Sequence, residues 1–243
     1  MTNSIDVSFF IPCLNEEKNI HPTLNNLVQI MDNFNLNYEI VICDDYSKDS
    51  TLQVIENFII NNKHLSINLI KNKYKKGLGR NYIDCAFIAK GKYYMLINGD
   101  NAEPGETIIT ILKNFSQADM IIPFFDNEDN RSVFRVFTSK FFTFVVNLLS
   151  GLKIPYYNGP VLHLRYNVMR WSPDTHGYAY QAELITRIIM EGGNYITVKI
   201  KNISRKQGIS KAFNFQNLLS VLHSLLQIFL RRLRIIMFYS NKN

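Results

Sequence analysis

The stretch Val7-Ser8-Phe9-Phe10-Ile11-Pro12 is the first apolar run of the chain, and it decides how the N-terminal half is interpreted. Its β-branched and aromatic residues predict a short buried strand, which we expect to end at Pro12 because proline cannot continue a central strand. Asn15-Glu16-Glu17 follows, and apolar residues then recur at helical spacing from Ile20 to Met31. The segment therefore predicts a strand followed by a helix.

The same order repeats along the chain. We predict further strands over 38–43, 65–70 and 93–97, with helices over 52–59 and 82–89 and a basic, glycine-containing loop over 71–79. The second half predicts strands over 121–125 and 195–200, a long apolar helix over 131–152 and a loop entering a helix over 177–190. Strands that alternate with helices are typical of βαβ units. We therefore expect an α/β protein, a single Rossmann-like domain with a mostly parallel central sheet flanked by helices.

Polar residues follow three of these strands: Asn15-Glu16, Asp44-Asp45 and Asn98-Gly99-Asp100. Ligands of open α/β sheets bind beyond the carboxyl ends of the strands, so these side chains are expected to share one site. The alternative is that they only terminate strands or cap helices. The strand ends carry neither GxGxxG nor GxxxxGK[ST], so a dinucleotide fold or a P-loop would lack its phosphate cradle.

Composition narrows the class of protein. The chain has 243 residues, of which 47% are hydrophobic and 19% charged, which fits a globular core and excludes a disordered or collagen-like chain. The formal charge of +7 is uneven, since nine basic and no acidic residues lie between Gly192 and Asn243. An anionic partner is therefore expected there. Nucleic acid is not expected, because the basic tail lacks a recognisable nucleic-acid-binding module.

The cysteines and histidines offer no metal pattern. Cys13, Cys43 and Cys85 lie in or beside apolar stretches, which favours buried, reduced thiols in a cytoplasmic protein. The histidines 163, 176 and 223 lack ligand-like spacing and are expected to be surface or packing residues. We expect no signal peptide, because residues 1–6 are polar and the apolar run that follows is short.

Six motifs in order resemble the family 2 glycosyltransferases with a GT-A fold, and most closely the dolichyl- or polyprenyl-phosphate sugar synthases. They are IPCLNE at 11–16, CDDYSKDST at 43–51, KGLG at 76–79, AKGKY at 89–93 leading into NGD at 98–100, GYAYQAE at 177–183 and RKQGISK at 205–211. Each motif alone is weak, but together they span most of the chain. The resemblance implies transfer of a sugar from a nucleotide-diphosphate sugar, with inversion.

The resemblance also implies a donor site. Asp45 matches the family's base-contacting aspartate, and the other matched positions of the donor site are Pro12, Asn15, Glu16, Gly79, Asn98 and Asp100. The family holds a divalent cation, Mg²⁺ or Mn²⁺, with an Asp-x-Asp motif, and the cation offsets charge on the diphosphate. Here Asn98 replaces the first aspartate, so Asp100 is the expected metal ligand, and Glu103 could add an oxygen.

Catalytic roles follow from the resemblance as well. Arg205 and Lys211 match a basic loop that closes on the donor and acceptor phosphates, and Glu183 matches an acid that serves as a base or orients the acceptor. The expected acceptor is a lipid phosphate such as polyprenyl or dolichyl phosphate. Tyr156 stands near a position where the lipid-phosphate synthases usually carry an aspartate. Two alternatives therefore stay open: a soluble or glycan hydroxyl acceptor, and a nucleotide-sugar-binding protein without turnover.

The end of the chain predicts a separate element. We divide the chain into a GT-A domain over 1–211 and a C-terminal basic amphipathic helix over 212–243. Polar residues step by three or four along one stripe and leucines along another, which favours a helix lying on an anionic bilayer, where Arg231, Arg232 and Arg234 would contact lipid. The alternatives are packing on the catalytic domain and a contact in a homo-oligomer. We expect a protein that is peripheral on the cytoplasmic face of a membrane.

Overall fold

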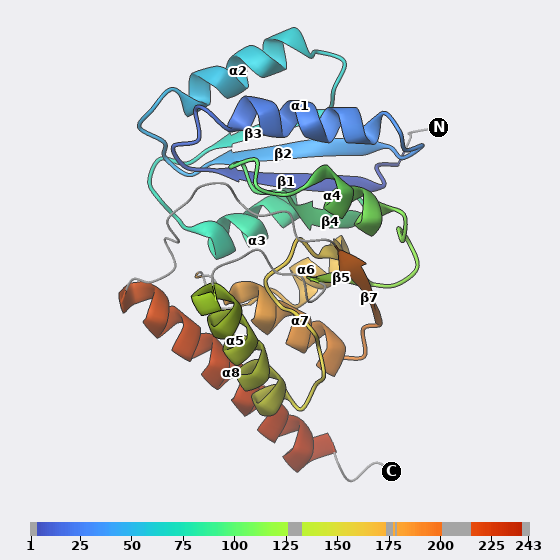
Figure 1. The fold of residues 1–243 in the computed structure, drawn as a ribbon, viewed down its shortest axis with the longest axis vertical. Coiled ribbons are helices and arrows are strands. Elements are labelled where there is room, and N and C mark those ends of the chain that lie inside the picture. Colours follow the sequence, from blue (N-terminus) through green and yellow to red (C-terminus); the bar gives the residue numbers. More distant parts are fainter. Residues whose placement is uncertain (1–3, 126–132, 174–176, 178, 201–214, 240–243) are drawn as a thin grey trace.

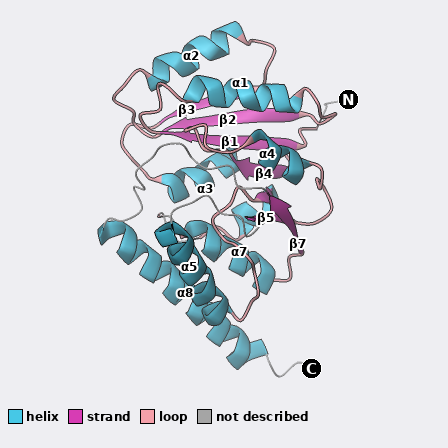
Figure 2. Cartoon of the chain, in the orientation of Figure 1, coloured by secondary structure: helices cyan, strands magenta, loops and turns pink. Residues whose placement is uncertain are grey.

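The computed structural model describes residues 4–125, 133–173, 177, 179–200 and 215–239. Strands and helices alternate along it (Figures 1 and 2). In chain order the elements are β1 (Val7–Cys13), α1 (Ile20–Met31), β2 (Tyr38–Asp44), α2 (Thr51–Asn61), β3 (Ile67–Lys71), α3 (Leu78–Ile88), β4 (Tyr93–Leu96), α4 (Gly105–Leu112), β5 (Met120–Phe125), α5 (Val133–Ser150), β6 (Leu162–Leu164), α6 (Arg165–Arg170), α7 (Tyr180–Met190), β7 (Tyr195–Ile200) and α8 (Phe215–Tyr239).

The strands form one sheet in the order β3-β2-β1-β4-β6-β5-β7. The pairs β1–β2, β1–β4, β2–β3 and β5–β7 are parallel, and among the described strands only the short β6 runs antiparallel to its neighbours β4 and β5. The predicted mostly parallel sheet is therefore confirmed. The parallel strands β1 to β4 bring their carboxyl ends, and the polar residues that follow three of them, to the same edge of the sheet.

Helices cover both faces of the sheet (Figure 1). Alternate residues of β1 divide between the two layers: Val7, Phe9 and Ile11 pack with α1, α2 and α4, while Phe10 packs with α3, α6 and α7. Successive side chains of a strand point to opposite faces, so a strand buried on both faces is apolar at nearly every position. The second cluster extends outward to α5 and α8 through the buried side chains of Val146 and Ile228.

The expectation that β1 ends at Pro12 is wrong. β1 continues to Cys13, and Pro12 pairs with Cys43 of β2. The neighbour on the other side, β4, pairs with β1 only as far as Phe10, and a last hydrogen bond runs from the N–H of Ile97 to the carbonyl of Phe10. Beyond that point β1 is an edge on this side, where a missing N–H costs no ladder bond, so proline is tolerated.

Other boundaries differ from the prediction. Helix α3 begins at Leu78 instead of residue 82, so Gly79 lies in the first helical turn and not in the preceding loop. The residue before the helix, Gly77, has φ of 88°, a conformation that favours glycine. The helices α4 and α6 and the strand β6 were not predicted, because each is too short to display a period of its own.

The buried carboxylate of Glu39 joins β2 to β1 and to the turn before β4. Glu39 of β2 accepts hydrogen bonds from Ser8 Oγ, at 2.6 Å, and from the backbone N–H groups of Lys90 and Gly91. A Cβ at Gly91 would lie 2.5 Å from the backbone nitrogen of Ser8, so only glycine fits. This contact explains the glycine of the Ala-Lys-Gly-Lys-Tyr motif, and sequence reasoning did not foresee it.

The predicted C-terminal helix is present as α8, which packs against α5 and α7. Its buried side chains include Ser224 and Ile228, and the Arg232 guanidinium donates to the carbonyl of Leu148 at the end of α5. Within the described residues, no helix has both the length and the apolar content needed to cross a membrane. The predicted boundary between residues 211 and 212 lies outside the described residues, so the division at that point stays a prediction.

Candidate functional site

The loops after β1 and β2 are joined by hydrogen bonds between side chains and backbone. Asn15 Oδ1 accepts from the N–H of Lys48 at 2.8 Å, and the N–H of Asn15 donates to Ser47 Oγ at 3.0 Å. The N–H of Glu16 donates to Thr51 Oγ1 at 2.7 Å. The polar residues of the second motif therefore hold the first loop in place, and the predicted site residues Asn15 and Glu16 lie beside the end of β2.

The loop after β4 closes on the same edge. A Cβ at Gly99 would lie 2.7 Å from the carbonyl oxygen of Pro12, so glycine lets this turn approach β1. The Thr23 hydroxyl of α1 donates to the carbonyl of Gly99 at 3.2 Å. The structure thus brings the turn that carries Asn98 and Asp100 against the end of β1, as the strand-end argument predicted.

Three residues at these strand ends have a left-handed backbone: Asn15 with φ of 57°, Tyr46 with φ of 71° and Asn101 with φ of 54°. Asparagine adopts this region readily, but for a bulky residue such as tyrosine it is an outlier. Strained backbone concentrates at functional sites. The Tyr46 ring is 43% exposed directly after Asp45, and the Lys48 ammonium lies 3.3 Å from its centroid. Tyr46 is therefore a candidate site residue that the sequence did not single out.

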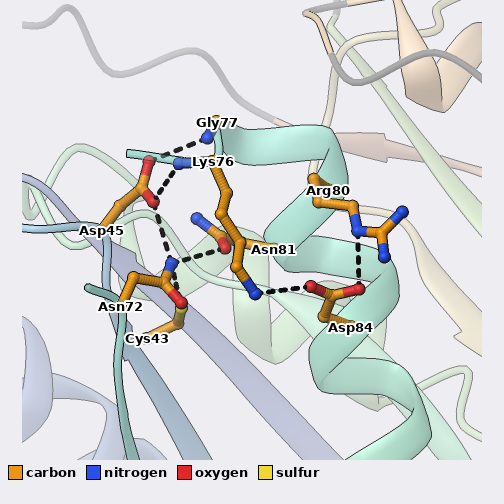
Figure 3. A network of polar contacts seen from close by, with 8 residues as sticks. All are labelled: Cys43, Asp45, Asn72, Lys76, Gly77, Arg80, Asn81 and Asp84. Carbon is orange, nitrogen blue, oxygen red and sulfur yellow. Dashed lines mark hydrogen bonds and ion pairs between the residues drawn. The ribbon is translucent and has the colours of Figure 1, made fainter. Parts of the chain in front are cut away.

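Asp45 is the centre of a network at the start of α3 (Figure 3). Its Oδ1 accepts from Asn72 Nδ2 at 2.9 Å and from the N–H of Lys76 at 2.8 Å, and its Oδ2 accepts from the N–H of Gly77 at 2.9 Å. Burial alone would raise the pKa of Asp45, but these backbone N–H groups and the neighbouring side-chain amides outweigh it and lower the pKa. Asp45 is therefore an ionised carboxylate that also holds the loop before α3.

Basic side chains surround this network. Lys76 Nζ and Arg80 Nε both contact the carboxylate of Asp84, at 2.9 and 2.8 Å (Figure 3). The hydrogen bond with Asp84 raises the pKa of Lys76. A pocket of about 570 Å³ lies on this side of α3, and its walls include Asn72, Lys76 and Arg80. Among the residues that the structure describes, none of the seven predicted donor-site residues lines this pocket.

Asn72 and Asn81 were also missed from the sequence. Asn72 donates both to Asp45 and to Asn81 Oδ1, the latter at 2.8 Å, and Asn81 is almost fully buried in the first turns of α3. Asn72 directly follows β3, so the strand-end rule that selected Asp45 would have selected it too. Asn81 had no comparable signal, because its partner lies in another segment.

The residues after β4 fit a divalent cation. Asn98 Nδ2 donates to Glu103 Oε1 at 2.7 Å, and Asp100 Oδ1 accepts from the N–H of Ala102, so the turn after β4 carries two carboxylates and one side-chain amide. Such hard oxygen donors suit Mg²⁺ and Mn²⁺. No set of three or more His, Cys, Asp or Glu residues suited to a metal occurs in the described part of the chain. Mg²⁺ sites built on one or two carboxylates take further ligands from substrate phosphates.

Glu183 lies in a different environment. It sits in the first turn of α7, is fully buried, and its Oε1 lies 3.4 Å from Arg231 Nη2 of α8. The start of α7 approaches α3 through Tyr180, whose ring centroid is 5.0 Å from that of Tyr82. The predicted roles of Glu183 as base or acceptor-orienting group stay predictions. Arg205 and Lys211 lie outside the described residues.

Comparison with known proteins gives the family. The sequence model of glycosyl transferase family 2 matches residues 8–174, well over half of the chain, so this protein belongs to that family. An uncharacterized glycosyltransferase from Synechocystis is 28% identical over 63% of this chain and 48% of its own length. A dolichyl-phosphate beta-glucosyltransferase from Dictyostelium discoideum is 26% identical over 52% of this chain and 38% of its own. The chain thus spans half or less of these two relatives.

Solved structures agree on the fold. Glucosyl-3-phosphoglycerate synthase from Mycobacterium tuberculosis, in complex with UDP, superposes with a TM-score of 0.67 at 14% identity, covering 91% of this chain and 80% of that one. A mannosyltransferase from Pyrobaculum calidifontis, in complex with GDP-Man and Mn²⁺, gives 0.65 at 17% identity, covering 96% and 65%. At these identities the likeness shows the fold alone, and that fold is the GT-A fold expected from the sequence.

Proposed function

We propose that this protein transfers a sugar from a nucleotide-diphosphate sugar to a lipid phosphate, with inversion, at the surface of a membrane. The observation that carries the proposal is the convergence of the Asp45 network and the Asn98–Asp100 turn on one edge of the sheet. Family membership and the similarity to a dolichyl-phosphate beta-glucosyltransferase support it. The complexes of structural relatives with UDP or with GDP-Man and Mn²⁺ support the donor class.

In this proposal the residues after β1 and β2 bind the nucleoside. Oδ2 of Asp45 accepts one hydrogen bond from its own chain, and a carboxylate oxygen has capacity for a second, here from a base N–H. Tyr46 offers an exposed ring beside it for stacking on a base. Pro12, Asn15 and Glu16 are proposed to form the wall of the nucleoside site on the side of β1. Gly79 leaves the first turn of α3 without a side chain at that position.

Asp100 and Glu103 would hold the cation, with the Asn98 amide completing the turn. When bound, Mg²⁺ or Mn²⁺ offsets the negative charge that grows on the diphosphate leaving group. Arg205 and Lys211 are proposed to neutralise phosphate oxygens from a closing loop. A lipid phosphate is already ionised and needs no general base, so Glu183 is proposed to orient the acceptor side through its contact with Arg231.

Thermal shift with UDP or GDP, with and without Mn²⁺, tests the donor and metal site. We expect a rise in melting temperature with one nucleotide that Mn²⁺ enlarges, since a ligand at about 100 times its Kd adds about 2.7 kcal/mol. Asp100→Asn should abolish the Mn²⁺-dependent part, whereas the exposed Asp32→Asn control should keep it. Asn98→Asp should enlarge it, because a second carboxylate would face Glu103 and a cation would relieve the repulsion.

The same measurement can contradict the proposal. Equal Mn²⁺-dependent shifts in the parent and in Asp100→Asn would exclude Asp100 as the ligand. Transfer assays then separate the acceptors: a short-chain prenyl phosphate should accept sugar, and a glycan hydroxyl should not. Donor binding with no transfer to either acceptor would favour a nucleotide-sugar-binding protein without turnover.

A further inference from the structure

Helix α5 carries a row of exposed aromatic side chains. Phe137, Phe141, Phe144 and Leu148 are spaced by four, three and four residues, so they share one face of the helix. Each of the four is between 59% and 66% exposed. The rings of Phe137 and Phe141 stack, with centroids 6.4 Å apart. Single exposed apolar residues are ordinary, but a contiguous row of large ones marks an interaction surface.

Helix α8 adds a second row. Leu218, Leu222 and Leu226 recur every four residues, and each is more than half exposed. The opposite face of α8 is the one that packs on the protein, since Ser224 and Ile228 are fully buried. This helix therefore presents leucines outward and keeps a partly polar face inward, the reverse of the usual arrangement of a helix on a globular core.

The two rows lie on one helix pair. α5 and α8 pack against each other and extend together away from the sheet (Figure 1). Both bury their opposite faces toward the protein, α5 through Val146 and α8 through Ile228, so the exposed rows lie on the outer side. We define this outer surface as the α5–α8 face, formed by Phe137, Phe141, Phe144, Leu148, Leu218, Leu222 and Leu226.

The charged residues of the two helices have one sign. The sequences of α5 and α8 contain no aspartate or glutamate, whereas Lys140 and Arg234 are exposed on them. Basic residues beside an apolar helix face complement the negative potential of an anionic bilayer, each contributing about 1 kcal/mol near the surface. An interface between two copies of this chain would instead bring like charges together.

We propose that the α5–α8 face docks on an anionic lipid bilayer, with its phenylalanine and leucine side chains at the boundary between headgroups and acyl chains. This inference rests on the proposed function, in which the acceptor is a lipid. It also revises the expected roles of two of the three arginines: Arg231 contacts Glu183 and Arg232 contacts the carbonyl of Leu148, so the apolar side chains carry more of the binding than these two residues do.

Co-sedimentation of the full chain with vesicles tests the proposal. With equal parts of phosphatidylglycerol and phosphatidylcholine, the parent should bind, and binding should fall between about 0.1 M and about 0.5 M salt. The double variant Phe141→Ser/Phe144→Ser should bind at least about tenfold more weakly, because two apolar side chains no longer leave water. The double variant Leu222→Ser/Leu226→Ser should weaken binding similarly. Ile60→Ser, equally exposed but on α2, should bind like the parent.

Two results would overturn the docking face. One is vesicle binding that is unchanged in both double variants while circular dichroism shows that they are folded. The other is a parent dimer, seen by analytical ultracentrifugation, that Phe141→Ser/Phe144→Ser converts to a monomer without any vesicle binding. Thermal shift with nucleotide and Mn²⁺ in the same variants separates the two proposals, since the donor site must survive these substitutions even if docking is disproved.

Discussion

His163 illustrates a residue whose chemistry is set by burial. It lies on β6, is 1% exposed, and its ring packs edge-on against Tyr82 with centroids 6.4 Å apart. His163 was expected to be a surface or a packing residue, and the structure shows that it is a packing residue. Burial disfavours the imidazolium and lowers the pKa of His163 to about 3. The imidazole is therefore neutral in the folded protein over the whole range from about pH 4 upward.

Stability should consequently fall on acidification. The unfolded chain binds a proton at His163 below about pH 6.5 and the folded chain does not until about pH 3, so the parent loses about 1.4 kcal/mol per pH unit between them from this group. His163→Phe removes this titration. Urea unfolding of both proteins from pH 7.5 to pH 4.5 should give a stability difference that is flat above pH 7 and shifts in favour of the variant below pH 6.5. Parallel pH profiles would contradict this account.

At the scale of elements, the contact between β1, β2 and the turn before β4 depends on one glycine. Ser8 and Gly91 approach so closely that Ser8 Oγ accepts from the N–H of Gly91 at 2.8 Å while it donates to Glu39. Each buried polar group here has a partner, which makes such a contact rigid and intolerant of added atoms.

Gly91→Ala should therefore destabilise the fold by about 1–3 kcal/mol or more, because the new Cβ would overlap backbone atoms of Val7 and Ser8 that cannot move independently. Gly105→Ala is the matched control: its Cβ would meet the flexible Cδ1 of Ile30 at 3.2 Å, and it lies at the start of α4. We expect the control to change stability by less than about 1 kcal/mol in urea unfolding. Equal effects of the two substitutions would mean that the turn before β4 can shift.

At the scale of the whole molecule, a buried ion pair connects α8 to α7, the helix that carries Glu183. Arg231 of α8 and Glu183 of α7 are 48 residues apart, and the Arg231 side chain is 13% exposed. The pair joins α8, which also packs against α5, to the start of α7. Helix α8 therefore packs as part of the same helical layer as α5 and α7.

Arg231→Leu should cost about 3 kcal/mol of stability, because it removes a positive charge from beside a carboxylate that has no access to water. The exposed Arg234→Leu, three residues further along the same helix, should change stability by less than about 0.5 kcal/mol. In a double-mutant cycle, Glu183→Gln should recover part of the loss in the Arg231→Leu background. Similar losses for the two arginines would show that the pair contributes nothing specific.

The sequence by itself determined the alternation of strands and helices, the mostly parallel sheet and the family. Apolar periodicity depends only on residues close in sequence. The order of motifs such as Cys43-Asp44-Asp45 can likewise be recognised without knowledge of how the chain packs. The strand-end rule also selected Asp45 and Asp100, since residues after parallel strands must meet at one edge. It would have selected Asn72 by the same reasoning.

Only the tertiary structure decided which segment each of these residues meets. Pro12 could remain in β1 because β4 ends early beside it, and Glu39 is buried because Ser8 and Gly91 supply its hydrogen bonds. The stripe pattern of α8 indicated an amphipathic helix but not which side faces the protein. That choice depends on contacts with α5 and α7, which are distant in sequence, and they turn Arg231 inward and the leucines outward. Periodicity gives the faces of an element, and long-range packing decides what each face contacts.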